Sequence, residues 1–338
     1  MSLLPIVENG IPLLDVALTS TLYFSDGHTP RTRNGVIALA KEYAALCEGN
    51  LRHWYCSADA DERVRYGAFD YQTISTVAAT LQGAHAMAPW ELGVGGGKEM
   101  EEATPFLMMC MGRGSWQQDM GQQGVVQFRL PWTWYATHES SFFDLFHRAC
   151  TLLRPNYGFG GLGFAYSTDQ DRRHRMIKDM YVIANAVPAL VVEDFVFGSS
   201  ELTKGIREGN WLTALSDAWL AKLGGGDEVA RALGPDFTCR SFEGGMTIQA
   251  GAEPNPIGPS ILKPAPPDPP AEPEDEIDHG VAQRDAASLY PLYHRLNQVL
   301  KPIRVSAADF KWGLQSNEYE KKDYFDHERT MRWMARFD

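Results

Sequence analysis

The stretch with the strongest resemblance to a chemical motif is the glycine-rich run at residues 93–98, which reads Gly-Val-Gly-Gly-Gly-Lys. A Walker A loop binds nucleotide phosphates and magnesium, and it needs glycine where Leu92 stands and Ser or Thr where Glu99 stands. Without the hydroxyl, a bound magnesium ion loses a ligand. The run therefore predicts a flexible hairpin or loop that Glu99 and the acids after it make acidic.

A second glycine pattern, at residues 158–163, satisfies G-x-G-x-x-G. That pattern binds a dinucleotide where a strand precedes it and a helix begins inside it. Here a helical pattern precedes it, and residues 164–166 continue as strand. We expect a tightly packed glycine-rich strand, although a nucleotide-dependent or hydrolytic enzyme that uses the two glycine-rich loops stays the alternative.

Histidines offer no metal site. His138-Glu139 and His327-Glu328 each begin like a zinc-binding helix, but Phe142 and Met331 stand where the second histidine belongs. No G-x-S-x-G elbow is present. The sequence predicts no catalytic residue, no metal and no cofactor, and it favours a protein that is not an enzyme.

Charge limits the class of partner. The chain of 338 residues has 31 Lys and Arg against 43 Asp and Glu, a formal net charge of −12. Nucleic acids and anionic membranes need basic residues to neutralise phosphate, so neither is an expected partner. A basic protein partner fits, because opposite fields speed encounter; solubility alone is the simpler explanation of the charge.

Three surface segments are the candidates for partner contact. They combine clustered carboxylates with one tryptophan in a polar, glycine-flanked loop, where an exposed aromatic side chain can anchor a complex. The candidates are Glu99, Glu101 and Glu102 in the first glycine loop, Trp116 and Asp119 in the next polar loop, and Glu272, Glu274, Asp275, Glu276 and Asp278 in a proline-rich arm.

The elements that must position these residues alternate between strand and helix. Residues 14–24 have the two-residue period of a strand, and Thr29 with Pro30 then forms the N-cap and first position of a helix that ends near Gly49. Similar patterns recur up to an apolar strand at residues 190–197. The fold class is α/β, with α+β the second possibility: a mixed sheet with helices packed on it.

Proline content divides the chain into three parts. We expect a main α/β domain at residues 1–253, a proline- and acid-rich linker or surface arm at 254–280, and a helical segment at 281–338 that docks on the main domain. No signal peptide or apolar run of membrane-spanning length is present, which predicts a cytoplasmic protein. The five cysteines form no metal or disulfide pattern, so buried free thiols are expected: Cys47, Cys56, Cys110, Cys150 and Cys239.

Several short motifs occur together in one order. These are residues 22–29 (LYFSDGHT), 209–213 (GNWLT), 223–225 (LGG), 248–251 (IQAG) and 333–338 (WMARFD). In this order and spacing the chain, from about residue 13 to its last residue, resembles the type VI secretion immunity family found beside nuclease effectors. The GNWLT motif is expected to lead into a helix with Leu215, Trp219 and Leu223 facing inward.

The resemblance implies an antitoxin that binds the nuclease domain of a cognate effector and protects the producing cell. Our hypothesis is a tight stoichiometric complex with a toxin that cleaves DNA, in which carboxylates replace the phosphates of the substrate. A structural component of the secretion machine is a third possibility. The oligomeric state stays open.

Overall fold

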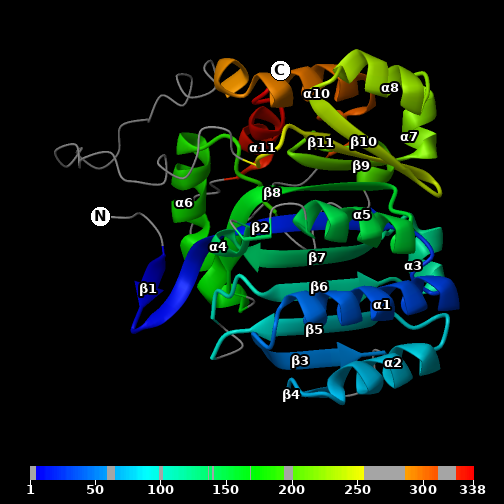
Figure 1. The fold of residues 1–338 in the computed structure, drawn as a ribbon, viewed down its shortest axis with the longest axis vertical. Helices are drawn as coiled ribbons and strands as arrows, with labels where there is room; N and C mark the ends of the chain where they lie inside the picture. The colour runs from blue at the N-terminus through cyan, green and yellow to red at the C-terminus, as the bar shows by residue number, and fades with distance from the viewer. Residues whose placement is uncertain are drawn as a thin grey trace.

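The computed structural model describes residues 5–58, 65–98, 102–135, 137–138, 141–167, 169–193, 201–254, 286–310 and 325–338. In this part of the chain, strands form a single sheet in the order β10-β11-β9-β8-β2-β7-β6-β5-β3-β4, and β1 pairs with β2 outside that path (Figure 1). The strands are β1 (Ile6–Glu8), β2 (Ile11–Phe24), β3 (Leu51–Ser57), β4 (Arg65–Ala68), β5 (Trp90–Gly96), β6 (Leu107–Gly112), β7 (Gly124–Pro131), β8 (Tyr157–Tyr166), β9 (Leu212–Ser216), β10 (Phe237–Phe242) and β11 (Gly245–Ala250).

Helices pack on this sheet, which confirms the predicted mixed α and β fold class. The named strand pairs are all antiparallel, and parallel pairing is confined to isolated bridges, so the arrangement is the α+β form. The helices are α1 (Pro30–Leu46), α2 (Thr73–Gly83), α3 (Ser115–Asp119), α4 (Trp132–Tyr135), α5 (Ser141–Leu153), α6 (Gln170–Ala186), α7 (Asp217–Lys222), α8 (Gly226–Leu233), α10 (Pro291–Leu300) and α11 (His327–Met334), with short 3-10 turns η1 (Glu201–Thr203) and η3 (Lys301–Ile303).

Two hydrophobic clusters hold the layers together. The larger one lies between the sheet and α1 and α5, which pack side by side across one face (Figure 1). The smaller one joins α6 and α11 to β2 and β8. The central strand β2 contributes to both clusters, so it is the element around which the fold is built.

Helix α1 begins where the sequence predicts. The Thr29 side chain accepts a hydrogen bond from the backbone N–H of Thr32, and Pro30 occupies the first helical position. The Tyr43 hydroxyl, on the buried face, donates to the carbonyl of Arg129 in β7 at 2.6 Å. The cap therefore fixes where the helix starts, and Tyr43 fixes it on the sheet.

The prediction of a flexible loop at the first glycine run was wrong for residues 93–96. They belong to β5, and a Cβ on Gly93 would lie 2.0 Å from the ring of Tyr55 on the neighbouring strand. Glycine is required there because an aromatic side chain crosses the strand. A run within a strand cannot wrap around a phosphate, so the nucleotide alternative loses its first loop.

The second glycine pattern is a packed strand, as predicted. It forms β8 at the centre of the sheet, where a Cβ on Gly158 would meet the Leu22 side chain at 2.2 Å and one on Gly163 would meet Thr19 at 2.3 Å. These glycines let β8 and β2 approach each other closely. The pattern has a packing role, and no helix begins inside it.

Two further expectations need correction. Within residues 190–193, Val191 makes only an isolated bridge to Gly163 in place of the predicted strand, and residues 194–197 lie outside the described part. Leu215 belongs to β9 and not to the helix that follows, since the chain turns into α7 only at Asp217. Strand pairing with β8 and β11 decides the conformation there.

The C-terminal part packs on the rest of the chain. Helix α10 contacts β11 and α8, and Phe337 lies in the larger cluster. Four cysteines are buried free thiols, as predicted, while Cys239 is partly exposed. Among the described residues, no helix has both the length and the apolar character needed to cross a bilayer.

Candidate functional site

Trp116 lies in a short helix, α3, and not in an irregular loop. It is 44% exposed, and its indole N–H donates to the carbonyl of Met87 at 3.1 Å. Ser115 adds two contacts to the same segment, from its N–H to Ala86 and from its hydroxyl to the sulfur of Met87. The tryptophan is thus held at the surface by its polar edge while its ring faces solvent.

Two methionines extend this exposed apolar surface. Met87 is 50% exposed and Met120 is 60% exposed. Asp119, also exposed, forms no ion pair with any residue that the structure describes. We call Met87, Trp116, Asp119 and Met120 the α3 platform. A cluster of aromatic and thioether groups beside a free carboxylate combines an adaptable apolar anchor with a charge.

The turn between β2 and α1 is hydrogen-bonded to α3. Gln118 exchanges two hydrogen bonds with Asp26: its amide donates to the carboxylate, and its carbonyl accepts from the Asp26 N–H, both at 2.9 Å. His28 lies 3.0 Å from the same Gln118 oxygen. This turn is part of the LYFSDGHT motif, so one of the family motifs positions the platform directly.

A buried arginine ties that turn to the segment that carries Met87. Arg33, 4% exposed, donates to the carbonyl oxygens of His28, Ala84 and His85. The indole of Trp90 also donates to the carbonyl of Gly27, at 2.8 Å. These bonds fix the backbone on both sides of the platform, an arrangement that favours binding because little order has to be gained when a partner binds.

The acidic glycine loop lies at the other end of the strands. Glu102 is half-buried, and its carboxylate accepts from the N–H of Lys98 at 2.7 Å. It follows the end of β5, whereas α3 lies beside the start of that strand, a separation of about 20 Å at about 3.3 Å per residue. The structure therefore does not bring Glu102 together with Trp116 and Asp119.

The remaining predicted contacts cannot be placed. Glu99 and Glu101 lie outside the described residues, and so do the carboxylates of the proline-rich arm. The sequence did not single out the platform residues Met87 and Met120 for binding, nor Asp26, which supports the platform through Gln118. Only the lack of charge around Met87 could have indicated them, because their proximity to Trp116 arises from the tertiary fold.

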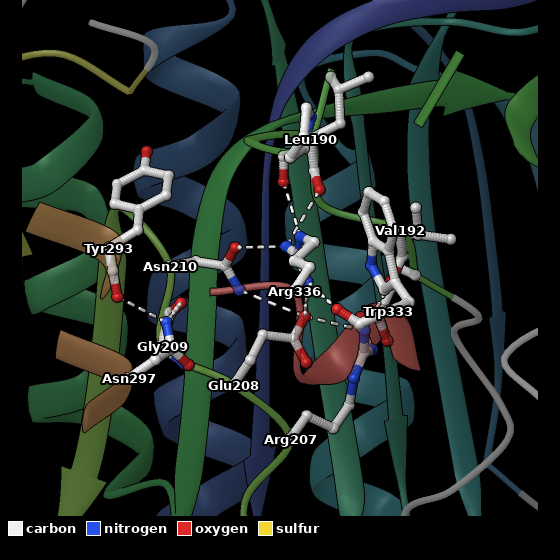
Figure 2. A network of polar contacts seen from close by, with 12 residues as sticks. Leu190, Val192, Arg207, Glu208, Gly209, Asn210, Tyr293, Asn297, Trp333 and Arg336 are labelled. Atoms are coloured by element: carbon white, nitrogen blue, oxygen red, sulfur yellow. Dashed lines mark hydrogen bonds and ion pairs between the residues drawn. The ribbon is translucent and has the colours of Figure 1, made fainter. Parts of the chain in front are cut away.

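A second constellation, of buried charges, involves residues of the GNWLT and WMARFD motifs, together with Tyr23 of the LYFSDGHT motif (Figure 2). Arg207 donates to Glu193 at 3.0 Å and to Glu208 at 3.2 Å, and these side chains are at most 2% exposed. The hydroxyl of Tyr23 donates to Glu193 at 2.8 Å. The hydroxyl of Tyr157 donates to the carbonyl of Glu208 at 2.6 Å.

Arg336, near the C-terminus, completes this network. Its guanidinium lies 3.8 Å from Glu208, 1% exposed, and donates to the carbonyls of Pro188 and Trp333 at 2.7 and 2.8 Å (Figure 2). Asn210, from the GNWLT motif, lies 3.5 Å from the same guanidinium. The motifs at residues 209–213 and 333–338 therefore meet in the interior.

An amide pair continues the network to α10. The Asn297 side chain accepts from the Gly209 N–H at 3.0 Å and donates to the Gly209 carbonyl at 2.9 Å (Figure 2). Arg304 then donates to Asn297 at 3.1 Å and pairs with Asp338. These contacts hold the C-terminal segment on the sheet.

Burial governs the protonation of these groups. It lowers the pKa of Arg336 from 12.5 to about 10, with Glu208 opposing the change. It raises the pKa values of Tyr23 and Tyr157 well above 10.0, and the neighbouring Glu193 and Glu208 respectively add to this. Such shifts also mark active sites, but these groups are inaccessible to any substrate, so the network is structural.

No described region supplies a metal centre. Among the residues that the structure describes, no group of three or more His, Cys, Asp or Glu side chains is placed to hold a metal ion. What the described surface offers is an exposed, rigid, partly apolar platform, which is the form of a protein-binding site.

Comparison with known proteins decides the family. Residues 36–269 of the 338 match the family model TsiV, described as type VI immunity for VRR-NUC. The chain belongs to this family. The predicted resemblance to type VI immunity proteins is thereby confirmed, and the toxin that a TsiV protein neutralises is an effector of the VRR-NUC nuclease class.

A solved structure shows the same fold. A type VI secretion system protein of Pseudomonas aeruginosa matches with a TM-score of 0.79 at 21% identity, covering 100% of this chain and 86% of that one. No curated protein sequence matches significantly. The TsiV chain is thus an immunity protein whose partner is its cognate nuclease toxin.

We expect Arg336→Met to lower the free energy of unfolding by about 3–5 kcal/mol, because it leaves Glu208 buried beside a single arginine. Arg175→Met is the matched control, since it breaks only the exposed ion pair with Glu8 and should cost less than about 1 kcal/mol. Urea unfolding measures both. Equal effects of the two substitutions would contradict a structural role for the network.

Stability should fall steeply as the pH rises above about 10. Unfolded tyrosines lose their protons near their ordinary pKa of 10.0, while Tyr23 and Tyr157 keep theirs, so the folded state binds more protons. Each contributes a loss of up to about 1.4 kcal/mol per pH unit, which the lowered pKa of Arg336 offsets in part. Urea midpoints at about pH 8 and pH 11 measure the loss, and Tyr157→Phe should reduce it; no reduction would contradict the assignment.

Proposed function

We propose that this TsiV protein neutralises its toxin by stoichiometric binding to the nuclease domain and catalyses no reaction. The observation that supports this is the α3 platform, an exposed tryptophan and two methionines fixed by hydrogen bonds from three segments. Tyr23 and Arg207, whose pKa values are both raised, are buried in the core. Because Tyr23 and Arg207 are closed to solvent, these groups are not available to a substrate, and the proposed site for a partner is at the surface.

The negative charge of this protein indicates which surface of the toxin it binds in this proposal. A nuclease must attract a polyanion, so the surface around its active site is basic. The carboxylate of Asp119 and the net charge of −12 complement such a surface. We propose that carboxylates of this chain replace substrate phosphates there, with Trp116 as the apolar anchor.

Glu99, Glu101 and Glu102 and the acidic arm form a separate contact in this proposal. Glu102 lies at the opposite end of the strands from α3, so a toxin that contacts both must extend along the full length of β5. The same proposal places the protein in the cytoplasm, where it meets the toxin before secretion. A fluorescent fusion in the native host would show whether it is retained there.

Titration distinguishes binding from catalysis. Increasing amounts of this protein should reduce the activity of the purified cognate nuclease linearly and abolish it near one equivalent. An enzyme that modifies the toxin would inactivate it at a small fraction of an equivalent and leave a covalent change visible by mass spectrometry. The second pattern would overturn the proposed function.

Substitutions test the site. Trp116→Ala should weaken toxin binding about 30-fold or more, as loss of an interface anchor does, and Asp119→Lys should slow association and reduce its dependence on salt. Val182→Ala removes an equally exposed apolar side chain from α6 and should change nothing. Surface-based binding kinetics with the nuclease domain measure all three.

The triple variant Glu99→Lys, Glu101→Lys, Glu102→Lys separates the two contacts in the same assay. Slower association of this variant, with Trp116→Ala also weakened, supports both contacts. If only the triple variant binds less tightly, the toxin binds at the glycine loop and the α3 platform is not the site.

A further inference from the structure

The segment from the second residue of β4 to the start of β5 has very few charged residues, although Arg65 at the start of β4 is charged and exposed. Residues 66–90 contain Asp70 as their one Asp, Glu, Lys or Arg in 25 positions, where a chain that is 22% charged would have five or six. The Asp70 carboxylate is engaged locally, accepting from the N–H of Gln72 at 2.9 Å and the hydroxyl of Thr73 at 3.2 Å. In a protein of net charge −12, this segment is an exception.

The segment nevertheless has an exposed surface. Tyr71 is 89% exposed and Tyr66 is 75% exposed, the highest values among the large hydrophobic side chains that the structure describes. Helix α2 turns the uncharged residues Ser75, Ala79 and Gln82 to solvent. Uncharged surfaces with exposed tyrosines are typical of protein contacts, since tyrosine buries a large area and loses little side-chain entropy.

Strand β4 adds an open backbone edge. It is the last strand of the sheet path, below β3 in Figure 1. The N–H of Phe69 bonds to Arg52, and the register with β3 is antiparallel, so the N–H and C=O groups of Tyr66 and Ala68 point away from β3. The strand at the other end of the path, β10, has Arg240 exposed and paired with Asp144. Of these two edge strands, only β4 has no charged residue in its middle, since Arg65 is at its first position.

We propose that the β4–α2 surface, defined as β4, Tyr71 and the outer face of α2, binds a second copy of this chain. The two β4 strands pair antiparallel about a twofold axis at Gly67, so that Tyr66 of one copy lies opposite Ala68 of the other. These two residue pairs exchange four backbone hydrogen bonds. Gly67 has no side chain and allows close approach at the axis.

Charge selects the second copy over the toxin. Two molecules of net charge −12 repel each other wherever their carboxylates meet, and the β4–α2 surface has no carboxylate to add to that repulsion. A basic nuclease is complemented by acidic surface, which β4 and α2 do not provide. The dimer leaves α3 of each copy available, because α3 is not part of this surface.

Sedimentation velocity over a concentration series, with light scattering, tests this on the full chain. We expect a species of twice the 37.7 kDa chain mass. Raising the salt from about 50 to about 500 mM should strengthen the dimer, because salt screens the repulsion between like charges.

Two variants address the interface directly. Tyr66→Lys places a charge on the edge, and Ala68→Pro removes an outward N–H without touching the β3 ladder; each should weaken self-association about tenfold or more. Val182→Lys, an exposed apolar residue on α6, is the matched control and should dimerise normally. Circular dichroism checks that every variant is folded.

Three results would overturn the proposal. The first is a monomer at every concentration. The second is a dimer that both β4 variants leave unchanged. The third is a monomer whose β4 variants bind the toxin less tightly, which would assign this surface to the toxin. Loss of toxin binding by Trp116→Ala bears on the α3 platform alone, so the two proposals fail separately.

Discussion

The rest of the structure depends on a constraint at its centre: two arginines and two glutamates share a site that solvent does not reach. A buried charge is tolerated only with its partners in place, so Arg207, Glu193, Glu208 and Arg336 must come together or not at all. They come from segments up to about 140 residues apart in the chain. The C-terminus is therefore held on the centre of the sheet by charges that are costly to leave unpaired, and these buried groups have a structural role.

The charged groups of the interior stabilise the fold, so a partner must bind at the surface. Hydrogen bonds between separate segments also hold the α3 platform in place. Arg33 and Gln118 join three separate segments beneath Trp116 and Met87. A surface fixed in this way loses little entropy when a partner binds, so more of the contact energy remains as affinity.

Charge distinguishes the two surfaces that we propose for binding. The α3 platform has Asp119 free beside its apolar side chains, which suits a nuclease that must attract nucleic acid. The β4–α2 surface has an open strand edge and no carboxylate, with Arg65 as its charged residue, which suits a copy of the same acidic molecule. Both use exposed aromatic side chains, so it is the electrostatic surroundings of Trp116 and Tyr66, more than their hydrophobicity, that separate the kinds of partner.

The sequence by itself determined the family, the mixed α and β class, the acidic character, the capped start of α1 and the glycine-rich strand β8, because these depend on motifs, composition and neighbours in the chain. Tertiary structure decided the strand order, the convergence of Glu208 on Arg336, and the meeting of Trp116 with Met87. It also overrode local preference at Gly93, where a flexible loop was expected and the ring of Tyr55 needs a flat strand beneath it. Contacts between distant segments are set by burial and strand pairing, which no local pattern encodes.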